Sequence, residues 1–567
     1  MKKIPYGISD YKTIVEENYI YVDKTRYIEI LEESGEPYVV FLRPRRFGKS
    51  LFTSVLEYYY DVRYKDEFDE LFKDTYISKK STNKKNSYYV LKFNFSGINT
   101  NTKESLLTGF TKNVIDGIKN FEIKYQIKTN YNVSGMPSEI FKEFLTEAKQ
   151  KINGQIYVII DEYDHFANEL LSYQVDTFEE TISRTGFVRK WYEVLKIGTE
   201  NGLVQRIYMT GVSPITLDSM TSGFNIAKNK ARHIKLNECL GFTEEEVEYI
   251  LKETIGEDID IKKEMPLLKR YYNGYLFNED AKNRIFNSDM VLYYASEYQT
   301  LGNRPKVLID PNISSDYNKI SNLFTLKNRE RNMTILQEII EGNEQENVTI
   351  TAEYSLAKEF TSEDFKSLLF YLGFLTIKDS IINMVNLQVP NYVIKEMYFD
   401  FFGKIIKEEA DYDLDIGKLK NAIIKIAQKG EIKEYLEIVQ TTLNKLSNRD
   451  FIKFDEKYVK VIMVTYLMMS KIYYVKSEDE LGGGYVDIAL LPRIGAKTKY
   501  NAIFEVKYIK KENYSEEALN KEIEEARGQI RKYTKSQELV DIEKEKNLKK
   551  WIVVFCKDEV VYLEELE

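Results

Sequence analysis

A candidate phosphate-binding turn lies at Phe47-Gly48-Lys49-Ser50. It follows the continuous apolar run of residues 38–42, typical of a strand buried on both faces, and precedes a helical pattern at residues 50–60. Backbone N–H groups at such a turn point toward an anion, and the small Gly48 lets the chain approach phosphate. Lys49 would then reach the β- and γ-phosphates of a nucleotide, and the Ser50 hydroxyl would bind Mg²⁺.

The residues around this turn add candidate contacts and one departure. The pattern G-x-x-x-x-G-K-[ST] begins with glycine, whereas this chain has Arg43 at that position. Arg45 and Arg46 either contact phosphate or are solvated. The string Gly-Lys-Ser also occurs by chance, so other segments must support it. The predicted nucleotide contacts are Arg45, Arg46, Phe47, Gly48, Lys49, Ser50 and Leu51.

An acidic segment farther along the chain supports a nucleotide site. The apolar run of residues 156–160 ends in Asp161-Glu162. We expect Asp161 to hold Mg²⁺ through water and Glu162 to polarise the attacking water. Thr210, at the end of the next strand pattern, is a candidate sensor of the γ-phosphate. The alternatives are a strand ending in two solvated acids and, at Thr210, a strand followed by a turn.

A different kind of site is indicated near residue 500. Asp487 and Glu505 lie in two strand-like segments that we expect to be neighbours, and Lys507 shares a sheet face with Glu505. The two carboxylates, with the Val506 carbonyl as a third ligand, would hold Mg²⁺ or Mn²⁺, which prefer hard oxygen ligands. Such a metal lowers the pKa of bound water and neutralises a scissile phosphate, while Lys507 would orient that water. The alternative is an exposed Glu-x-Lys strand face.

Two flanking helical patterns extend this acidic site. Glu456 lies at the start of the preceding helix and is a candidate additional metal ligand. Ala526, Gln529 and Tyr533 share one face of the following helix. Gln529 and Tyr533 would support the site or contact substrate, whereas simple packing explains Ala526 and is an alternative for Tyr533.

Composition limits the class of protein. The chain has 567 residues, 43% of them hydrophobic and 30% charged, with a net charge of −9. A protein that coats nucleic acid would be basic, so we expect at most a local basic groove. Cys239 and Cys556 make no disulfide framework, and two histidines are too few for a histidine metal centre. With neither a signal peptide nor an apolar run long enough for a bilayer, we expect a cytoplasmic protein without membrane contact.

Strand and helix patterns alternate over the first 230 residues, which predicts a parallel α/β sheet. The capping box at residues 243–246 starts a mostly helical region, and residues 301–350 are expected to be a linker or irregular insertion. A helix, a hairpin (residues 374–377 and 384–389) and a helix after Pro390-Asn391 suggest a winged-helix-like unit. The predicted domains are an ATPase core (1–235), a helical lid (236–300), a helical linker with the winged-helix-like region (301–430) and a nuclease-like domain (431–567).

Several of these motifs together resemble known families. The N-terminal half resembles the AAA-ATPase-like proteins, and the C-terminal segment resembles the PD-(D/E)XK nuclease domain often fused to them. The N-terminal match is carried by Pro5-Tyr6-Gly7, residues 21–25, 43–50 and 160–164, Thr210-Gly211-Val212-Ser213-Pro214 and Tyr272-Asn273-Gly274-Tyr275. The C-terminal match is carried by Ser477-Glu478, residues 484–487, Glu505-Val506-Lys507-Tyr508, Ala526, Gln529 and Tyr533, and the bridging residues 390–396 also fit.

The resemblance implies a P-loop sheet with a helical lid, followed by an α/β restriction-endonuclease-like domain, and it implies ATP and a divalent metal as cofactors. In the N-terminal family an arginine in place of the first loop glycine is normal. One departure concerns the metal site, because some relatives carry a histidine four residues after the Glu456 position, where this chain has Lys460. That departure puts the role of Glu456 in doubt more than that of Asp487.

Three functions remain open from the sequence. The first is an ATPase coupled to a Mg²⁺-dependent nuclease that cuts DNA. The second is a regulatory ATPase whose nuclease-fold domain only binds nucleic acid or a protein partner; the intact set Asp487, Glu505 and Lys507 argues against it. The third is an RNA-directed nuclease. Assembly into a homo-oligomer is a further expectation, in which Arg45, Arg46 or Arg232 would serve a neighbouring subunit.

Overall fold

The computed structural model describes residues 1–167, 186–214, 224–312, 323–324, 328–352, 360–410, 413–446, 455–480, 485–493, 495–533 and 547–566. It divides into two compact units. The first comprises residues 1–304, 308–334 and 344–392, and the second comprises residues 305–307, 335–343 and 393–567. Each unit is described separately below.

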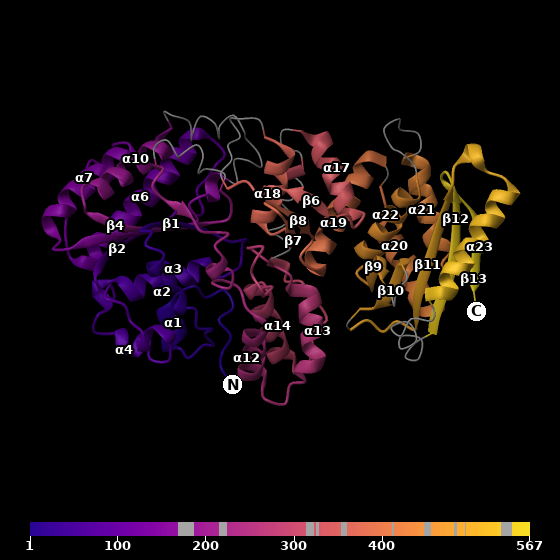
Figure 1. Ribbon diagram of the computed structural model, residues 1–567, viewed down its shortest axis with the longest axis horizontal. Helices are drawn as coiled ribbons and strands as arrows, with labels where there is room; N and C mark the ends of the chain where they lie inside the picture. Colours follow the sequence, from indigo (N-terminus) through magenta and orange to yellow (C-terminus); the bar gives the residue numbers. More distant parts are fainter. Residues whose placement is uncertain are drawn as a thin grey trace. The chain divides into compact units, whose positions relative to one another are not determined.

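The first unit is built on a parallel sheet with strand order β2-β3-β4-β1-β5 (Figure 1). Its central strands are buried along almost their whole length, as the apolar runs predicted. The parallel α/β prediction is therefore confirmed. The strands are β1 (Tyr38–Leu42), β2 (Tyr88–Asn94), β3 (Gln155–Asp161), β4 (Val204–Gly211) and β5 (Lys228–Asn229).

Helices cover both faces of this sheet. Helix α3 (Lys49–Tyr60) packs on β2 and β3 from one side, while α6 (Lys103–Tyr125) packs on β2 and α10 (Phe187–Glu200) on β4. Figure 1 shows α3 on the opposite side of the strands from α6 and α10. The other helices of residues 1–200 are α1 (Tyr11–Glu16), α2 (Arg26–Glu33), η1 (Val62–Tyr64), α4 (Phe68–Leu71), α5 (Tyr76–Lys79) and α7 (Pro137–Lys151) among the described residues.

A helical group follows the sheet. Thr243 and Glu246 form the predicted capping box at the start of α12 (Glu244–Ile255), each side chain bonding the backbone N–H of the other. Asn287 is the N-cap of helix α14, and its side chain accepts from the N–H groups of Asp289 and Met290. The other elements are η2 (Ile234–Leu236), α13 (Ile261–Tyr272) and α14 (Ser288–Leu301).

The region of residues 328–392 is more ordered than predicted. Residues 301–350 were expected to be irregular, but they contain α17 (Arg329–Ile340) and β6 (Gln345–Val348). The predicted hairpin is present as β7 (Thr376–Ile381) paired with β8 (Met384–Gln388), and β6 joins it in the order β6-β8-β7. Helix α18 (Ser362–Leu372) precedes the hairpin, starting at a capping box of Thr361 and Asp364. A helix thus precedes the hairpin, as a winged-helix-like unit requires.

The second unit is built on a mixed sheet with the order β13-β12-β11-β10-β9. Helix α23 packs on β10, β11 and β12, while α22 packs on β9, β10 and β11. The predicted order of a helix, two strands, a helix and a strand is present, with β9 and the edge strand β13 as additions. The elements are α19 (Tyr392–Ala410), α20 (Ile416–Lys429), α21 (Lys433–Leu446), α22 (Glu456–Met469), β9 (Tyr473–Glu480), β10 (Tyr485–Pro492), β11 (Tyr500–Ile509), η3 (Lys511–Asn513), α23 (Glu516–Tyr533), β12 (Asn547–Cys556) and β13 (Glu559–Leu566).

The division into units places residues 393–430 with the second unit, inside the segment assigned to the linker region. Helix α20 contacts β11, and α21 contacts β13. The boundaries of the four predicted domains remain predictions. No helix within the described ranges combines the length and the apolar character needed to cross a bilayer.

Candidate nucleotide and metal sites

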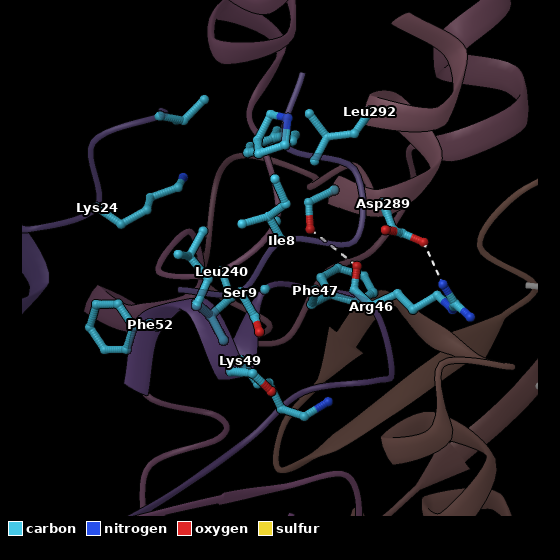
Figure 2. A pocket seen from close by; sticks show the side chains of 18 of the residues that line it. Ile8, Ser9, Lys24, Arg46, Phe47, Lys49, Phe52, Leu240, Asp289 and Leu292 are labelled. Carbon is cyan, nitrogen blue, oxygen red and sulfur yellow. Dashed lines mark hydrogen bonds and ion pairs between the residues drawn. The ribbon is translucent and has the colours of Figure 1, made fainter. Parts of the chain in front are cut away.

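A cavity of about 410 Å³ opens beside the start of α3 (Figure 2). Such a volume accommodates a nucleotide. One side is the phosphate loop with Lys49, and Ile8 and Leu292 lie across the cavity from it in Figure 2. The predicted contacts Arg45, Arg46, Phe47, Gly48, Lys49, Ser50, Leu51 and Glu162 all line it. Residues that the sequence did not indicate also line it, among them Ile8, Tyr21, Lys24, His165, Leu240, Ser288, Asp289 and Leu292.

The loop has the backbone geometry that its sequence requires. Gly48 has φ +87°, a left-handed conformation that strains any residue with a side chain. Lys49, immediately after it, is buried, and its ammonium donates to the carbonyl oxygens of Arg43 (3.1 Å) and Pro44 (2.9 Å). Burial lowers the pKa of Lys49. Because the partners are neutral carbonyls, the charge is held at the loop without a carboxylate bonded to it.

Arg43 is a structural residue in this fold. Its guanidinium is 1% exposed, donates to the carbonyl oxygens of Ala231 (2.7 Å) and Leu236 (2.7 Å), and lies 4.0 Å from the ring centroid of Phe277. Burial lowers the pKa of Arg43 to about 10. The side chain that replaces the usual glycine thus ties the loop to residues 231–237. Arg43 does not line the cavity.

The acidic pair at the end of β3 is placed for metal and water chemistry. Asp161 is 2% exposed. Burial raises the pKa of Asp161, and the nearby Ser50 hydroxyl opposes that rise. Among the described residues, Oδ1 of Asp161 has no hydrogen-bond partner. A buried carboxylate oxygen without a partner beside a serine hydroxyl fits a Mg²⁺ bound by Ser50 and Asp161.

Glu162 has a partner that the sequence did not indicate. Its carboxylate lies 3.2 Å from Nδ1 of His165, three residues on, and this contact lowers the pKa of Glu162. Glu162 also has φ +53°, a conformation that non-glycine residues adopt mainly where the surrounding structure imposes it. His165 lines the same cavity. The i, i+3 spacing of Glu162 and His165 is the only sequence signal that would have found it.

We expect His165→Ala to lower ATP turnover by about tenfold, because it removes the group that orients Glu162. The pKa of Glu162 would rise without the imidazole, so the acidic limb of the pH–rate profile should move to higher pH. The check is steady-state hydrolysis from pH 5 to 8, with His233→Ala, the other histidine of the chain, as the control. Equal rates and pH profiles for His165→Ala and the wild type would contradict the role.

Thr210 lies at the end of β4, as predicted, but its hydroxyl is engaged by the neighbouring strand. Its side chain is fully buried, its hydroxyl donates to the carbonyl oxygen of Phe41 (2.9 Å), and it does not line the cavity. A hydroxyl committed to the neighbouring strand does not support the predicted γ-phosphate contact. The following residues have a different role, because Asp164 accepts from the N–H groups of Val212 (3.0 Å) and Ser213 (2.6 Å). A Cβ on Gly211 would meet Asp164 Oδ1 at 2.1 Å, so this tight turn requires glycine.

The phosphate loop is also bonded to the start of α14. Arg46 pairs with Asp289 (2.8 Å), and its carbonyl oxygen accepts from the Ser288 hydroxyl (3.1 Å), as Figure 2 shows. Arg46 has φ +65°. The guanidinium of Arg46 is therefore engaged by a carboxylate in this structure, and a phosphate contact would require it to exchange partners.

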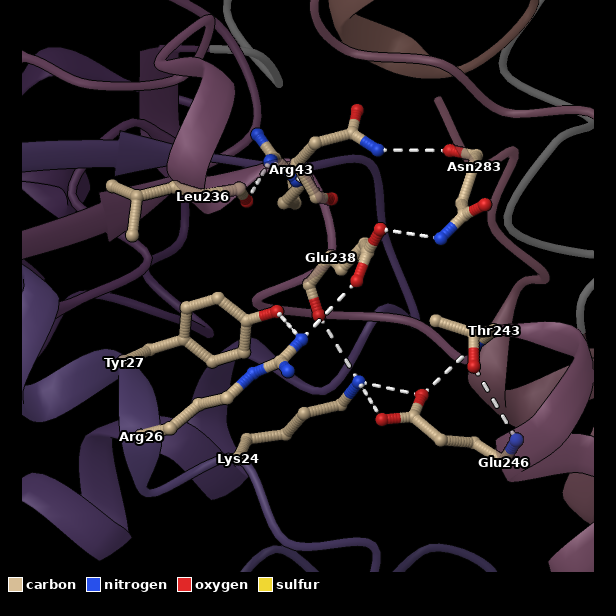
Figure 3. Close-up of polar contacts among 10 residues, drawn as sticks. Lys24, Arg26, Tyr27, Arg43, Leu236, Glu238, Thr243, Glu246 and Asn283 are labelled. Atoms are coloured by element: carbon tan, nitrogen blue, oxygen red, sulfur yellow. Dashed lines mark hydrogen bonds and ion pairs between the residues drawn. The ribbon is translucent and has the colours of Figure 1, made fainter. Parts of the chain in front are cut away.

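Lys24 joins the N-terminal segment to α12 (Figure 3). Its ammonium lies 2.6 and 2.7 Å from the two carboxylate oxygens of Glu246 and 3.0 Å from the carbonyl oxygen of Glu238. Burial lowers the pKa of Lys24, opposed by Glu246. Glu246 is also the capping-box residue of α12. The Glu246 side chain thus caps the start of α12 and also holds Lys24, which lines the cavity.

Lys24→Met is expected to lower the free energy of unfolding by about 3 kcal/mol, because it leaves the Glu246 carboxylate unpaired in a largely buried place. The double variant Lys24→Met/Glu246→Gln should recover part of that loss. Urea unfolding of the single and double variants measures both. Exposed Lys3, paired with Glu17 at 3.8 Å, gives the control variant Lys3→Met, for which a change under about 0.5 kcal/mol is expected.

The acidic site of the second unit lies where two strands separate. The antiparallel pairing of β10 with β11 ends at Ile488 opposite Phe504, so Asp487 and Glu505 are the first residues beyond it. Instead of a backbone hydrogen bond to β10, the Val506 N–H donates to the side chain of Asp487 at Oδ2 (2.8 Å). Lys507 lies on the same face as Glu505, with its ammonium 3.2 Å from Glu505 Oε1 and 3.6 Å from Glu525 Oε1 of α23. The predicted neighbourhood of Asp487, Glu505 and Lys507 is present.

Glu505 has the environment of a metal ligand. It is 1% exposed, and neither carboxylate oxygen accepts a hydrogen bond of good geometry from the part of the chain that the structure describes. Burial, with Asp487 nearby, raises the pKa of Glu505 to about 8. A buried acid without hydrogen-bond donors is costly when ionised unless a cation is close. Asp487, Glu505 and the backbone at Val506 offer oxygen donors that fit Mg²⁺ or Mn²⁺.

The helical residues predicted for this site differ in their placement. Glu456 Oε1 lies 2.7 Å from the ammonium of Lys460, which also contacts Asp487. Among the residues that the structure describes, no group of three or more histidine, cysteine, aspartate or glutamate side chains gathers as a metal site. Glu456 as a ligand therefore stays a prediction. Gln529 is half-buried with an unpartnered Oε1, Ala526 belongs to the core under α23, and the side chain of Tyr533 lies outside the described residues.

Comparison with known proteins supports both halves. Residues 5–221 match the AAA-ATPase-like family, described as "Predicted AAA-ATPase", and residues 454–565 match the PD-(D/E)XK nuclease superfamily. A relative from Azotobacter chroococcum mcd 1, "Uncharacterized protein in vnfD 5'region", is 26% identical over 308 residues. That alignment covers 53% of this chain and 53% of the relative, so the chain spans about half the length of the relative it matches.

Two solved structures show a weaker likeness. Drosophila ORC bound to GC-rich DNA and Cdc6 is 10% identical, with 75% of this chain and 70% of that chain covered and a TM-score of 0.21. Drosophila ORC bound to poly(dA/dT) DNA and Cdc6 has a TM-score of 0.19 over 77% and 70%, again at 10% identity. Scores this low carry no argument about the present chain. On the family matches, the chain combines an AAA-ATPase-like domain at residues 5–221 with a PD-(D/E)XK nuclease superfamily domain at residues 454–565.

Proposed function

We propose that this protein binds and hydrolyses ATP with its first unit and cuts nucleic acid, DNA ahead of RNA, with its second. The observation that carries the proposal is the pairing of two prepared sites in one chain. One is a cavity lined by Lys49, Ser50 and Glu162 at the phosphate loop, with the buried Asp161 near Ser50. The other is the strand fork, the point where β10 and β11 separate, which brings Asp487, Glu505 and Lys507 together.

For ATP, each residue has a physical task. The loop N–H groups and Lys49 hold the phosphates, and Ser50 and Asp161 hold Mg²⁺, which would neutralise charge on the transferred phosphoryl group. Glu162, oriented by His165, accepts a proton from water. The apolar wall opposite Lys49, with Ile8, Leu240 and Leu292, suits the flat face of a purine.

For nucleic acid, Asp487 and Glu505 would hold Mg²⁺ or Mn²⁺, which supplies an activated water and charge neutralisation when bound. The Lys507 ammonium, 3.2 Å from Glu505, is placed to donate to the water and to the phosphate. The strand fork leaves the backbone at Val506 free of the β10 ladder, so its carbonyl is a candidate third ligand. Gln529 on α23, with an unpartnered Oε1, is a candidate contact for substrate or bound water.

A substrate panel tests the nuclease half. Supercoiled plasmid, linear duplex, single-stranded DNA and single-stranded RNA are incubated with the full chain and Mg²⁺, with Glu505→Gln as the control. DNA cleavage by the wild type that is lost in Glu505→Gln supports the proposal. Cleavage confined to RNA would make RNA the substrate in place of DNA. If no substrate is cut while ATP is still hydrolysed, the second candidate stands: a regulatory ATPase whose nuclease-fold domain only binds.

Location and assembly form part of the same proposal. Cys239 and Cys556 are both free thiols, which fits a reducing compartment such as the cytoplasm. We also propose a homo-oligomer. Size-exclusion chromatography with light scattering, with and without ATP, tests the assembly, and a monomer under both conditions contradicts it.

A further inference from the structure

Lys460 is an unexpected cation within the acidic site. It lies on α22, its side chain is 12% exposed, and its ammonium is 2.5 Å from Asp487 Oδ1 and 2.7 Å from Glu456 Oε1. The other oxygen of Asp487 accepts from the Val506 N–H. Both oxygens of Asp487 are therefore engaged, whereas Glu505 beside it, with the Lys507 ammonium 3.2 Å from its Oε1, accepts no hydrogen bond of good geometry from the described residues.

This arrangement bears on how a metal would enter. A metal that uses Asp487 Oδ1 needs the lone pair to which Lys460 now donates, so the ammonium and the metal exclude each other at that atom. A lysine ammonium is a compact point charge, and a charge-assisted bond at this distance is strong.

We propose that Lys460 is a built-in competitor for the catalytic metal: its ammonium occupies the metal-binding oxygen of Asp487 and keeps the site closed until a divalent ion displaces it. The inference rests on the proposed nuclease function of this site. Displacement would free the lysine on its flexible stem to pair with a phosphate oxygen of the substrate. Metal and nucleic acid should accordingly bind cooperatively, each favouring the state in which Lys460 has left Asp487.

A purely structural role for Lys460 makes a different prediction. If the lysine only neutralises Glu456 and Asp487 to stabilise the fold, removing its charge would weaken the fold and leave metal affinity unchanged. Metal binding measured directly separates the two roles, because it does not depend on activity.

The test is Mn²⁺ binding to the full chain, measured through the electron paramagnetic resonance signal of the free ion. The nucleotide site is silenced in every sample by Ser50→Ala/Asp161→Asn. In this background we compare the unsubstituted Lys460 with Lys460→Met, which keeps the stem, Lys460→Arg, which keeps the charge, and Lys445→Met, an exposed lysine on α21. Asp487→Ala reports the binding that belongs to the site.

Lys460→Met is expected to lower the Kd for Mn²⁺ by about tenfold or more, the equivalent of losing one charge-assisted contact, while Lys460→Arg and Lys445→Met stay near the parent. If Lys460→Met does not fold, as judged by circular dichroism, Lys460→Gln is measured instead. A Kd unchanged in Lys460→Met or Lys460→Gln, with binding still lost in Asp487→Ala, overturns the competitor role alone. Absence of Mn²⁺ binding in every sample overturns the nuclease proposal, and the inference with it.

Discussion

Arg43→Gly restores the residue that usually opens a phosphate loop, yet we expect it to lower the free energy of unfolding of the first unit by about 3–5 kcal/mol. The reason is burial. The change removes a side chain that is 1% exposed and leaves the carbonyl oxygens of Ala231 and Leu236 without their donor. It also leaves a cavity against Phe277.

Trp191 and Trp551, the only tryptophans of the chain, allow the measurement to be specific. Trp191 is buried in the first unit and Trp551 in the second. In a Trp551→Phe background, urea unfolding followed by fluorescence reports the first unit. The control is Arg45→Gly in the same loop, where the side chain is more exposed and a loss of about 1 kcal/mol is expected. Arg43→Gly as stable as the control would contradict the structural role of Arg43.

Lys49→Ala should reduce ATP hydrolysis by about 10²–10³-fold, the usual cost of removing one prepared donor from developing negative charge. In this structure the ammonium bonds only the carbonyl oxygens of Arg43 and Pro44 among the described hydrogen bonds. Removing this ammonium leaves no buried carboxylate without its bonded partner, so the variant should remain folded. Phosphate release and binding of a fluorescent ATP analogue are the measurements.

Two controls make the result specific to the nucleotide site. Lys12→Ala, on α1 and paired with Glu67, should hydrolyse ATP at the wild-type rate. Asp487→Ala, in the other unit, should do so as well. Wild-type turnover by Lys49→Ala would show that the cavity beside α3 is not the site of hydrolysis.

Much of the fold was predictable because its signals are local. The apolar runs that became β1, β3 and β4 are buried on both faces, and the caps at Thr243 and Thr361 bond within a few residues. The short strand β6 (Gln345–Val348) was missed because its polar sequence carries no apolar alternation. The edge strand β13, with the sequence EVVYLEEL, was also missed.

The residue types of the sites were predictable from the sequence, whereas their hydrogen-bond partners were less so. Asp487, Glu505 and Lys507 were found because strand periodicity places them together. The partners of Arg43 lie about 190 residues away in the chain, and the acceptor of the Thr210 hydroxyl lies 169 residues away. Such bonds depend on which strands become neighbours, and no local pattern encodes that. The contact of Lys460 with Asp487 is of the same kind.

The most direct test of the two-site account is cleavage of supercoiled plasmid by the wild type and by Asp487→Ala, with Mg²⁺, each with and without ATP. The account predicts cutting by the wild type, a loss of at least about 10³-fold in Asp487→Ala, and a wild-type rate that changes when ATP is added. Cutting by Asp487→Ala at the wild-type rate, or no cutting by the wild type under any of these conditions, would contradict it.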